Sequence, residues 1–177
     1  MAHQELHGTA YLYTLAAVSV AFLGFTAIVV IIRQSVGEGL SRIQVLLVHV
    51  LIEHGFAVIG FALLPPLIAL FDLSHDLVLR ISSAVAALVV ILWHMEFSLR
   101  RYSSAVGQRL PRYAYVNFSL TAVFSVLLCL NAYGGLFEPQ AGVYAAAISW
   151  LLCQAANIFL LSFNVFLKKP KRKGVRA

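Results

Sequence analysis

Five long apolar stretches, each about as long as a bilayer core is thick, constrain this chain more than any other feature. They cover residues 11–32, 43–64, 81–99, 113–133 and 141–167. An α-helix needs about 20 apolar residues to cross the hydrocarbon core. Because 61% of the residues are hydrophobic and only 11% are charged, a soluble fold would lack polar side chains to cover its surface. The sequence therefore predicts an all-α, polytopic membrane helix bundle with five transmembrane helices.

The ends of the stretches carry helix-ending signals. Proline removes a main-chain donor, so Pro65-Pro66 predicts that the second helix ends at about residue 64 or bends sharply there. The following residues 67–76 are too short to span and are predicted to form an interfacial segment. Gly134-Gly135 predicts the end of the fourth helix. Residues 1–10 contain no Lys or Arg, so we expect the first helix to be retained rather than cleaved as a signal peptide.

Basic residues fall almost entirely on one side of this five-helix arrangement. Twelve of the thirteen Lys and Arg lie in the first and third connections or the tail, and Arg80 alone lies on the other side. Because cytoplasmic segments of membrane proteins are enriched in Lys and Arg, this split predicts an N-terminus outside and a C-terminus in the cytoplasm. We expect one transmembrane domain over residues 1–167 and a basic cytoplasmic tail over 168–177, in a cell membrane of the bacterial inner-membrane type.

Motifs of common enzymes are missing from the sequence. There is no G-x-S-x-G, no P-loop, no C-x-x-C and no H-E-x-x-H. The positive charge lies beside apolar stretches, so it indicates membrane topology rather than nucleic-acid binding. An enzyme is therefore less favoured than a channel, a transporter or a structural subunit.

Ionisable residues inside the second and third helices are the main functional candidates, because such residues are costly in a membrane and usually face a bundle interior or a cavity. They are His49, Glu53, His54, His94 and Glu96. His49 and Glu53 are four residues apart and share one helix face. Counting from Arg42 and back from Arg100, His49 and His94 lie at nearly equal depth, about 10 Å from the cytoplasmic helix ends. Glu96 is one turn from Arg100 and can pair with it.

Three interpretations of this cluster remain open. The side chains can form hydrogen bonds that hold the bundle together, with Glu53 protonated. They can form a proton or cation pathway, as chains of Asp, Glu and His do in pumps and transporters. His49, Glu53 and His94 can also supply three metal ligands, and His49 with His94 can clamp a haem, so haem or a divalent metal is a conceivable cofactor.

Neutral polar residues form stripes on the fourth and fifth helices. The stripe on the fourth helix consists of Asn117, Thr121 and Asn131, and that on the fifth of Trp150, Gln154, Asn157 and Asn164. Such stripes seldom face lipid. They are expected to form interhelical hydrogen bonds, with the lining of a polar pore or cavity as the alternative.

The tail is expected to contact anionic lipid, each basic residue near the surface contributing about 1 kcal/mol. These residues are Lys168, Lys169, Lys171, Arg172 and Lys173. The favoured function is a homo-oligomeric channel or transporter, because a single bundle of five helices has little room for a wide pathway. The alternatives are a non-catalytic subunit of a larger membrane complex and a membrane protein that binds haem or metal. The bilayer is the expected partner in every case.

Overall fold

The computed structural model describes residues 8–35, 42–96, 112–135 and 139–167, and within them it contains five α-helices and no strand. The helices are α1 (Thr9–Ser35), α2 (Arg42–Ala69), α3 (His75–Glu96), α5 (Arg112–Tyr133) and α6 (Ala141–Leu167). All five are long and apolar enough to cross a membrane. The prediction of an all-α chain with five helices of membrane-spanning length is confirmed, and the fifth predicted helix has the observed bounds. Residues 168–177, the predicted tail, lie outside the described residues.

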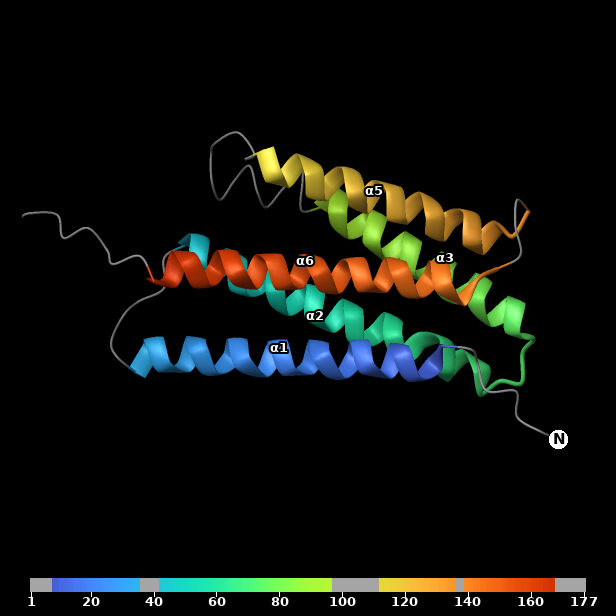
Figure 1. The fold of residues 1–177 in the computed structure, drawn as a ribbon, viewed down its shortest axis with the longest axis horizontal. Helices are drawn as coiled ribbons and strands as arrows, with labels where there is room; N and C mark the ends of the chain where they lie inside the picture. The colour runs from blue at the N-terminus through green and yellow to red at the C-terminus, as the bar shows by residue number, and fades with distance from the viewer. Residues whose placement is uncertain (1–7, 36–41, 97–111, 136–138, 168–177) are drawn as a thin grey trace, which may run out of the picture.

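The helices form an elongated bundle in which α6 contacts each of the other four (Figure 1). Helix α2 packs against α1, α6 and α3, and α5 packs against α3 and α6. The first residues of α1 and the last residues of α6 lie at opposite ends of the bundle (Figure 1). The core draws on all five helices, for example through Leu15, Val58, Val90, Leu128 and Ile148. These side chains hold the bundle together by close packing, since lipid offers little hydrophobic drive between helices.

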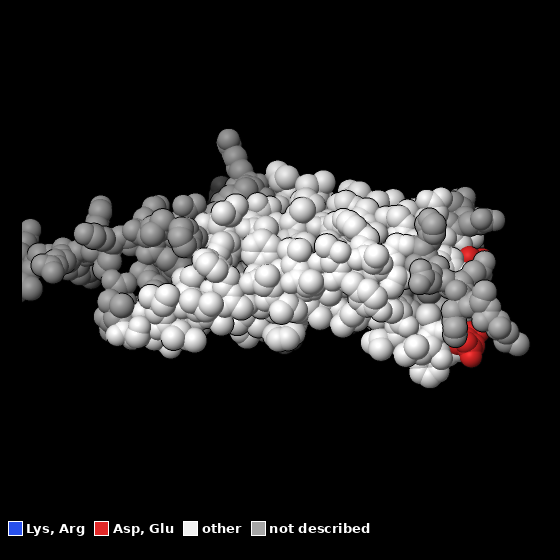
Figure 2. Space-filling model, turned by 60° about the horizontal axis from the view of Figure 1, so that its bottom comes forward, with Lys and Arg blue, Asp and Glu red and all other residues white. Residues whose placement is uncertain are grey.

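The outer surface is apolar, as expected of a protein surrounded by lipid. Exposed large hydrophobic side chains occur along the lengths of the helices, including Ile28, Phe56, Leu88 and Val123. In Figure 2 the described part of one face is almost free of charge, and its acidic atoms appear at the end where α2 connects to α3. Single exposed apolar residues are normal in soluble proteins, but an apolar surface of this extent marks a membrane or interaction surface.

The prediction that α2 ends near residue 64 is wrong. The helix continues through Pro65 and Pro66 to Ala69. Pro65 has no N–H to donate to the Phe61 carbonyl four residues earlier, and the hydroxyl of Tyr144 on α6 donates to that carbonyl at 2.7 Å instead. Proline is tolerated within membrane helices when a neighbouring helix satisfies the carbonyl that it frees. The continuation of α2 past its prolines therefore depends on a side chain of α6.

The predicted interfacial segment 67–76 is also absent as a separate element. Helix α2 takes up its beginning, α3 starts at His75, and a short connection with Asp72 at φ 53° joins them. Asp is among the residues that adopt a left-handed conformation most readily. Arg80 consequently lies on α3 and not in a loop. At the other predicted stop, Gly134 ends α5 with φ 66° and donates its N–H to the Leu130 carbonyl, so this signal is confirmed.

Gly55 provides a close approach between α1 and α2. A Cβ at this position would lie 2.6 Å from Cδ2 of Leu23, whereas a Cβ at Gly60 on the same helix would meet nothing within 4 Å. We expect Gly55→Ala to destabilise the bundle by about 1–3 kcal/mol, because Leu23 must move within a packed contact. Gly60→Ala should be neutral or slightly stabilising. Unfolding of both variants in mixed micelles checks the difference, and equal stabilities would contradict the close contact.

Candidate functional site

Helix periodicity brings His49 and Glu53 together on one face of α2, as predicted. His49 Nε2 lies 2.9 Å from Glu53 Oε1. The His49 side chain is 57% exposed and that of Glu53 27%, so this pair lies at the outer surface of α2. The indole N–H of Trp93 on α3 donates to Glu53 Oε2 at 3.0 Å. The carboxylate is therefore held by residues of two helices.

His54, the next residue on α2, points into the bundle. Its Nδ1 lies 2.8 Å from the Val50 carbonyl oxygen, and its Nε2 lies 3.2 Å from Oε1 of Gln154 on α6. The Trp93 ring lies 4.1 Å from the imidazole, centroid to centroid, at 65°. His54 is only 6% exposed and Gln154 only 3%, so neither side chain meets bulk solvent or lipid. His54 is thus the buried centre of the cluster and not a peripheral member.

Thr121 on α5 joins the hydrogen bonds of three helices. Its hydroxyl oxygen accepts hydrogen bonds from the indole N–H of Trp150, at 3.0 Å, and from the side-chain amide N–H of Gln154. The hydroxyl donates in turn to the Asn117 carbonyl at 2.9 Å. The structure thus holds two hydrogen-bonded groups, His49–Glu53–Trp93 and His54–Gln154–Thr121–Trp150, which meet where the Trp93 ring packs against His54. We call the two groups together the polar network. The network extends from the outer face of α2, through the bundle, to α5.

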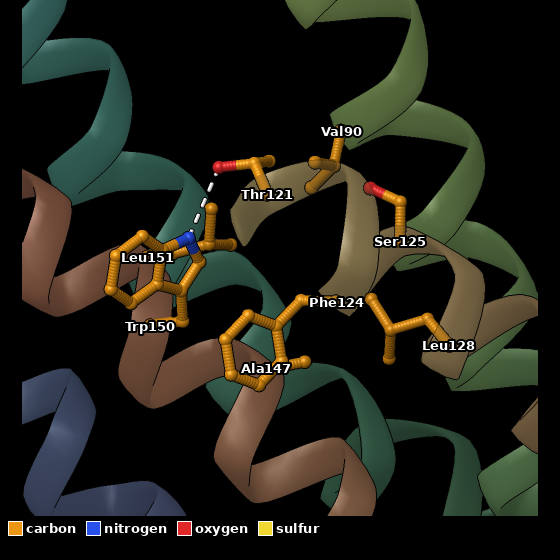
Figure 3. A pocket seen from close by; sticks show the side chains of 8 residues that line it. All are labelled: Val90, Thr121, Phe124, Ser125, Leu128, Ala147, Trp150 and Leu151. Carbon is orange, nitrogen blue, oxygen red and sulfur yellow. Dashed lines mark hydrogen bonds between the residues drawn. The ribbon is translucent and has the colours of Figure 1, made fainter. Parts of the chain in front are cut away.

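A small cavity adjoins the network on the side of Thr121 (Figure 3). Its volume is about 10 Å³, close to the room that one water needs. The indole of Trp150 stacks on the Phe124 ring at 5.7 Å, and Thr121 and Ser125 face the cavity among apolar neighbours. The remaining lining residues are Val90, Leu128, Ala147 and Leu151.

His94 does not join His49 and Glu53. Its ring packs edge-on against Phe118 of α5, 5.2 Å away, and 5.9 Å from its neighbour Trp93. Counting along the helices predicted His94 at the depth of His49, with Glu53 nearby. In the structure it is Trp93, the neighbour of His94 on α3, whose side chain reaches the Glu53 carboxylate. In the described ranges no three His, Cys, Asp or Glu side chains form a group that could hold a metal. The described part of the chain therefore does not bring the predicted ligands His49, Glu53 and His94 into one metal-binding group.

The remaining candidates have varied surroundings. Asn131 is fully buried, donates to Ser83 of α3 at 2.8 Å and accepts from the main-chain N–H of Gln140 at 2.8 Å. Glu96 is exposed at the end of α3, and its predicted partner Arg100 lies outside the described residues. Asn157 is exposed, so the stripe on α6 turns outward beyond Gln154. The side chain of Asn164 and the basic residues of the tail are outside the described part of the chain.

Trp93 is the network member that sequence reasoning missed. A tryptophan inside a membrane helix needs an acceptor for its indole N–H. Glu53 lies within about one helical turn of the depth of Trp93 on the preceding helix, so the pair could have been proposed from the sequence. No family model, curated protein or solved structure matches this chain. The interpretation of the site therefore depends on its own chemistry.

Proposed function

We propose that this chain conducts protons across a cell membrane, as a channel or proton-coupled transporter, and that the polar network is its proton pathway. The observation that carries the proposal is the buried hydrogen-bonded connection of His54, Gln154 and Thr121 beside the His49–Glu53 pair. Imidazole and carboxylate groups bind and release protons near neutral pH when their surroundings allow it. A purely structural network does not require two histidines and a glutamate within two turns of a membrane helix.

The depth of the network fits a pathway. Counted from the midpoints of the apolar spans, His54, Thr121 and Gln154 lie about 4–5 Å from the centre of the membrane and His49 about 11 Å. All lie within the roughly 15 Å half-thickness of the hydrocarbon core. Farther along α5, in the direction of the opposite membrane surface, Ser125 and Asn131 are buried. Polar groups therefore occur in both halves of the bundle.

The size of the cavity favours protons over larger cations. A volume of about 10 Å³ accommodates one water at most, whereas a hydrated cation would need several. Leu128 lies between Ser125 and Asn131 on α5 and lines the cavity. Proton passage then requires water to enter this stretch transiently, so the proposed pathway is gated rather than open.

We further propose that the N-terminus lies outside and the basic C-terminus in the cytoplasm of a bacterial inner membrane. The charge asymmetry supports this orientation, and an odd number of spans places the two ends on opposite sides. The polar network then lies in the cytoplasmic half. Residues 168–177 would contact anionic lipid headgroups from that side.

The position of the His49–Glu53 pair supports homo-oligomerisation. An ionisable pair exposed on α2 within the hydrocarbon core is costly when it faces lipid. A second copy that covers this face removes the cost and places two pairs side by side. A larger complex would cover the face equally well. Native mass measurement of the purified protein distinguishes a homo-oligomer from an assembly with another protein, and it also reports any bound haem or metal.

Proton flux into liposomes tests the function directly. We expect proteoliposomes with an imposed potassium-diffusion potential to acidify faster than empty liposomes, as reported by a trapped pH dye. Glu53→Gln should slow the flux by about tenfold or more, because an amide cannot carry the proton. Glu96→Gln, a matched change outside the network, should have no effect. Wild-type vesicles that acidify no faster than empty ones would refute the proposal.

A further inference from the structure

With the Gln154 amide oriented as in the structure, the hydrogen bonds around His54 do not balance if the imidazole is neutral. The Val50 carbonyl can only accept, so His54 Nδ1 must carry the hydrogen of that 2.8 Å contact. On the other side of the ring, Nε2 faces Oε1 of Gln154, which also can only accept. Both ring nitrogens therefore act as donors, and an imidazole with two N–H groups is the charged form.

The orientation of the Gln154 amide follows from Thr121. The hydroxyl of Thr121 gives its hydrogen to the Asn117 carbonyl, so toward Gln154 it can only accept. While the hydroxyl donates to Asn117, the amide directs its NH₂ group at Thr121 and its oxygen at His54. The indole N–H of Trp150 occupies the second acceptor position of the hydroxyl. The arrangement in the structure is therefore consistent throughout with a protonated His54.

A second arrangement of the same atoms is equally complete when His54 is neutral. The Nδ1–H group still donates to Val50, and the bare Nε2 now accepts from the NH₂ group of a reversed Gln154 amide. The oxygen of the amide then faces Thr121, whose hydroxyl turns from the Asn117 carbonyl to donate to it. The Trp150 bond is unchanged. The two arrangements differ by one proton on His54 Nε2, a reversal of one amide and the rotation of one hydroxyl.

We propose that His54 is the proton-binding residue of this protein and that Gln154 and Thr121 form a hydrogen-bond switch that responds to its protonation state. When a proton binds the lone pair of Nε2, the Gln154 amide reverses to present its oxygen, and the Thr121 hydroxyl rotates toward Asn117. When the proton leaves, both movements reverse. The switch transmits the state of a residue on α2 to α6 and α5. This inference deepens the proposed proton pathway and depends on it for its physiological role.

The hydrogen bonds around His54 can be completed in both states. Gln154 and Thr121 are 3% and 2% exposed, so no bulk water competes for their hydrogen bonds. The titratable groups near the imidazole are Glu53 on its own helix and His94 on α3, which have opposite electrostatic effects on an imidazolium. The groups of the switch on α6 and α5, Gln154 and Thr121, are uncharged. Trp93 lies against the ring and at the same time holds Glu53.

Solid-state ¹⁵N NMR of the full chain in lipid bilayers tests the switch without relying on transport. The chain has six histidines, and the signal lost in His54→Gln identifies the relevant ring. We expect both nitrogens of His54 to be protonated at the acid end of a titration. At the alkaline end we expect a protonated Nδ1 and a bare Nε2. The signal of the Gln154 side-chain amide should change in parallel.

Variants of Gln154 and Thr121 test the coupling. Gln154→Glu offers only acceptor oxygens when ionised, so at a fixed pH the ratio of charged to neutral His54 should rise about tenfold or more. Thr121→Val should uncouple the amide signal from the titration of His54, whereas Thr121→Ser retains the hydroxyl and should preserve the coupling. The protonation state of both ring nitrogens of His54 can be measured in the wild-type protein. The inference therefore remains testable even if one of these variants misfolds.

Two results would overturn the inference: a neutral His54 with its hydrogen on Nε2, or a ratio of charged to neutral His54 that does not respond to Gln154→Glu. Flux through the same proteoliposomes separates this inference from the proposed function. Switching without proton flux refutes transport alone. Flux through a protein in which His54 stays neutral at every pH where flux occurs refutes the switch alone.

Discussion

Liposomes that contain His54→Gln are expected to lose proton flux by roughly 10²-fold relative to the wild-type protein, the magnitude typical of losing one positioned proton-transfer group. Glutamine is polar and can still form a hydrogen bond with Gln154, but it cannot bind a proton near neutral pH. The loss should therefore come from the missing titratable group rather than from a hole in the bundle. The rate of dye acidification under an imposed membrane potential measures it.

His75→Gln is the matched control. His75 is exposed at the start of α3, outside the polar network, so the same chemical change should leave flux unchanged. Both variants should unfold in mixed micelles at nearly the wild-type detergent concentration. A stable His54→Gln protein with wild-type flux would remove His54 from the pathway, even if Glu53→Gln still slowed conduction.

The five spans were predictable because a bilayer imposes a length on each helix that can be counted along the chain. The His49–Glu53 pair was predictable for a similar reason, since two residues four apart share a face of any α-helix. Both features depend only on residues that are near one another in sequence. The end of α5 at Gly134 also belongs to this group, because its signal is local.

Contacts between helices were less predictable, since depth does not fix the rotation of one helix about its axis relative to another. His94 has the depth expected of a partner for His49, yet its neighbour Trp93 meets Glu53. Gln154 and Asn157 share a stripe on α6, but only Gln154 is buried, where it meets His54 of α2. The sequence therefore indicates which polar residues need partners without indicating which partner each one finds.

The length of α2 was mispredicted because its determinant lies on another helix. Phe61 has a carbonyl that Pro65 cannot satisfy, and the missing donor is the hydroxyl of Tyr144, far along the chain. Tyr144 is only 1% exposed, so water cannot take its place as a donor. The proline signal was interpreted correctly as a lost hydrogen bond. The error was to place the end of the helix at about residue 64, because a donor from another helix lets α2 continue to Ala69.

Removing this hydroxyl gives the second large effect that we expect. Tyr144→Phe should destabilise the bundle by about 1–3 kcal/mol, because the Phe61 carbonyl is left buried without the bond that replaces the Pro65 donor. Reversible unfolding in mixed micelles measures the loss. Tyr133→Phe, the same change at an exposed residue at the end of α5, should cost much less.

A double-mutant cycle with Pro65→Ala shows whether the hydroxyl acts by replacing the proline's missing donor. Alanine restores an N–H that can donate to Phe61 within the helix. Tyr144→Phe should then cost at least about 1 kcal/mol less in the Pro65→Ala background than in the wild type, since the carbonyl retains a partner. The smaller volume of alanine does not affect the comparison, because both proteins of the Pro65→Ala background contain it. Equal costs in the two backgrounds would mean that Tyr144 stabilises the bundle by packing alone, and the continuation of α2 past its prolines would need another cause.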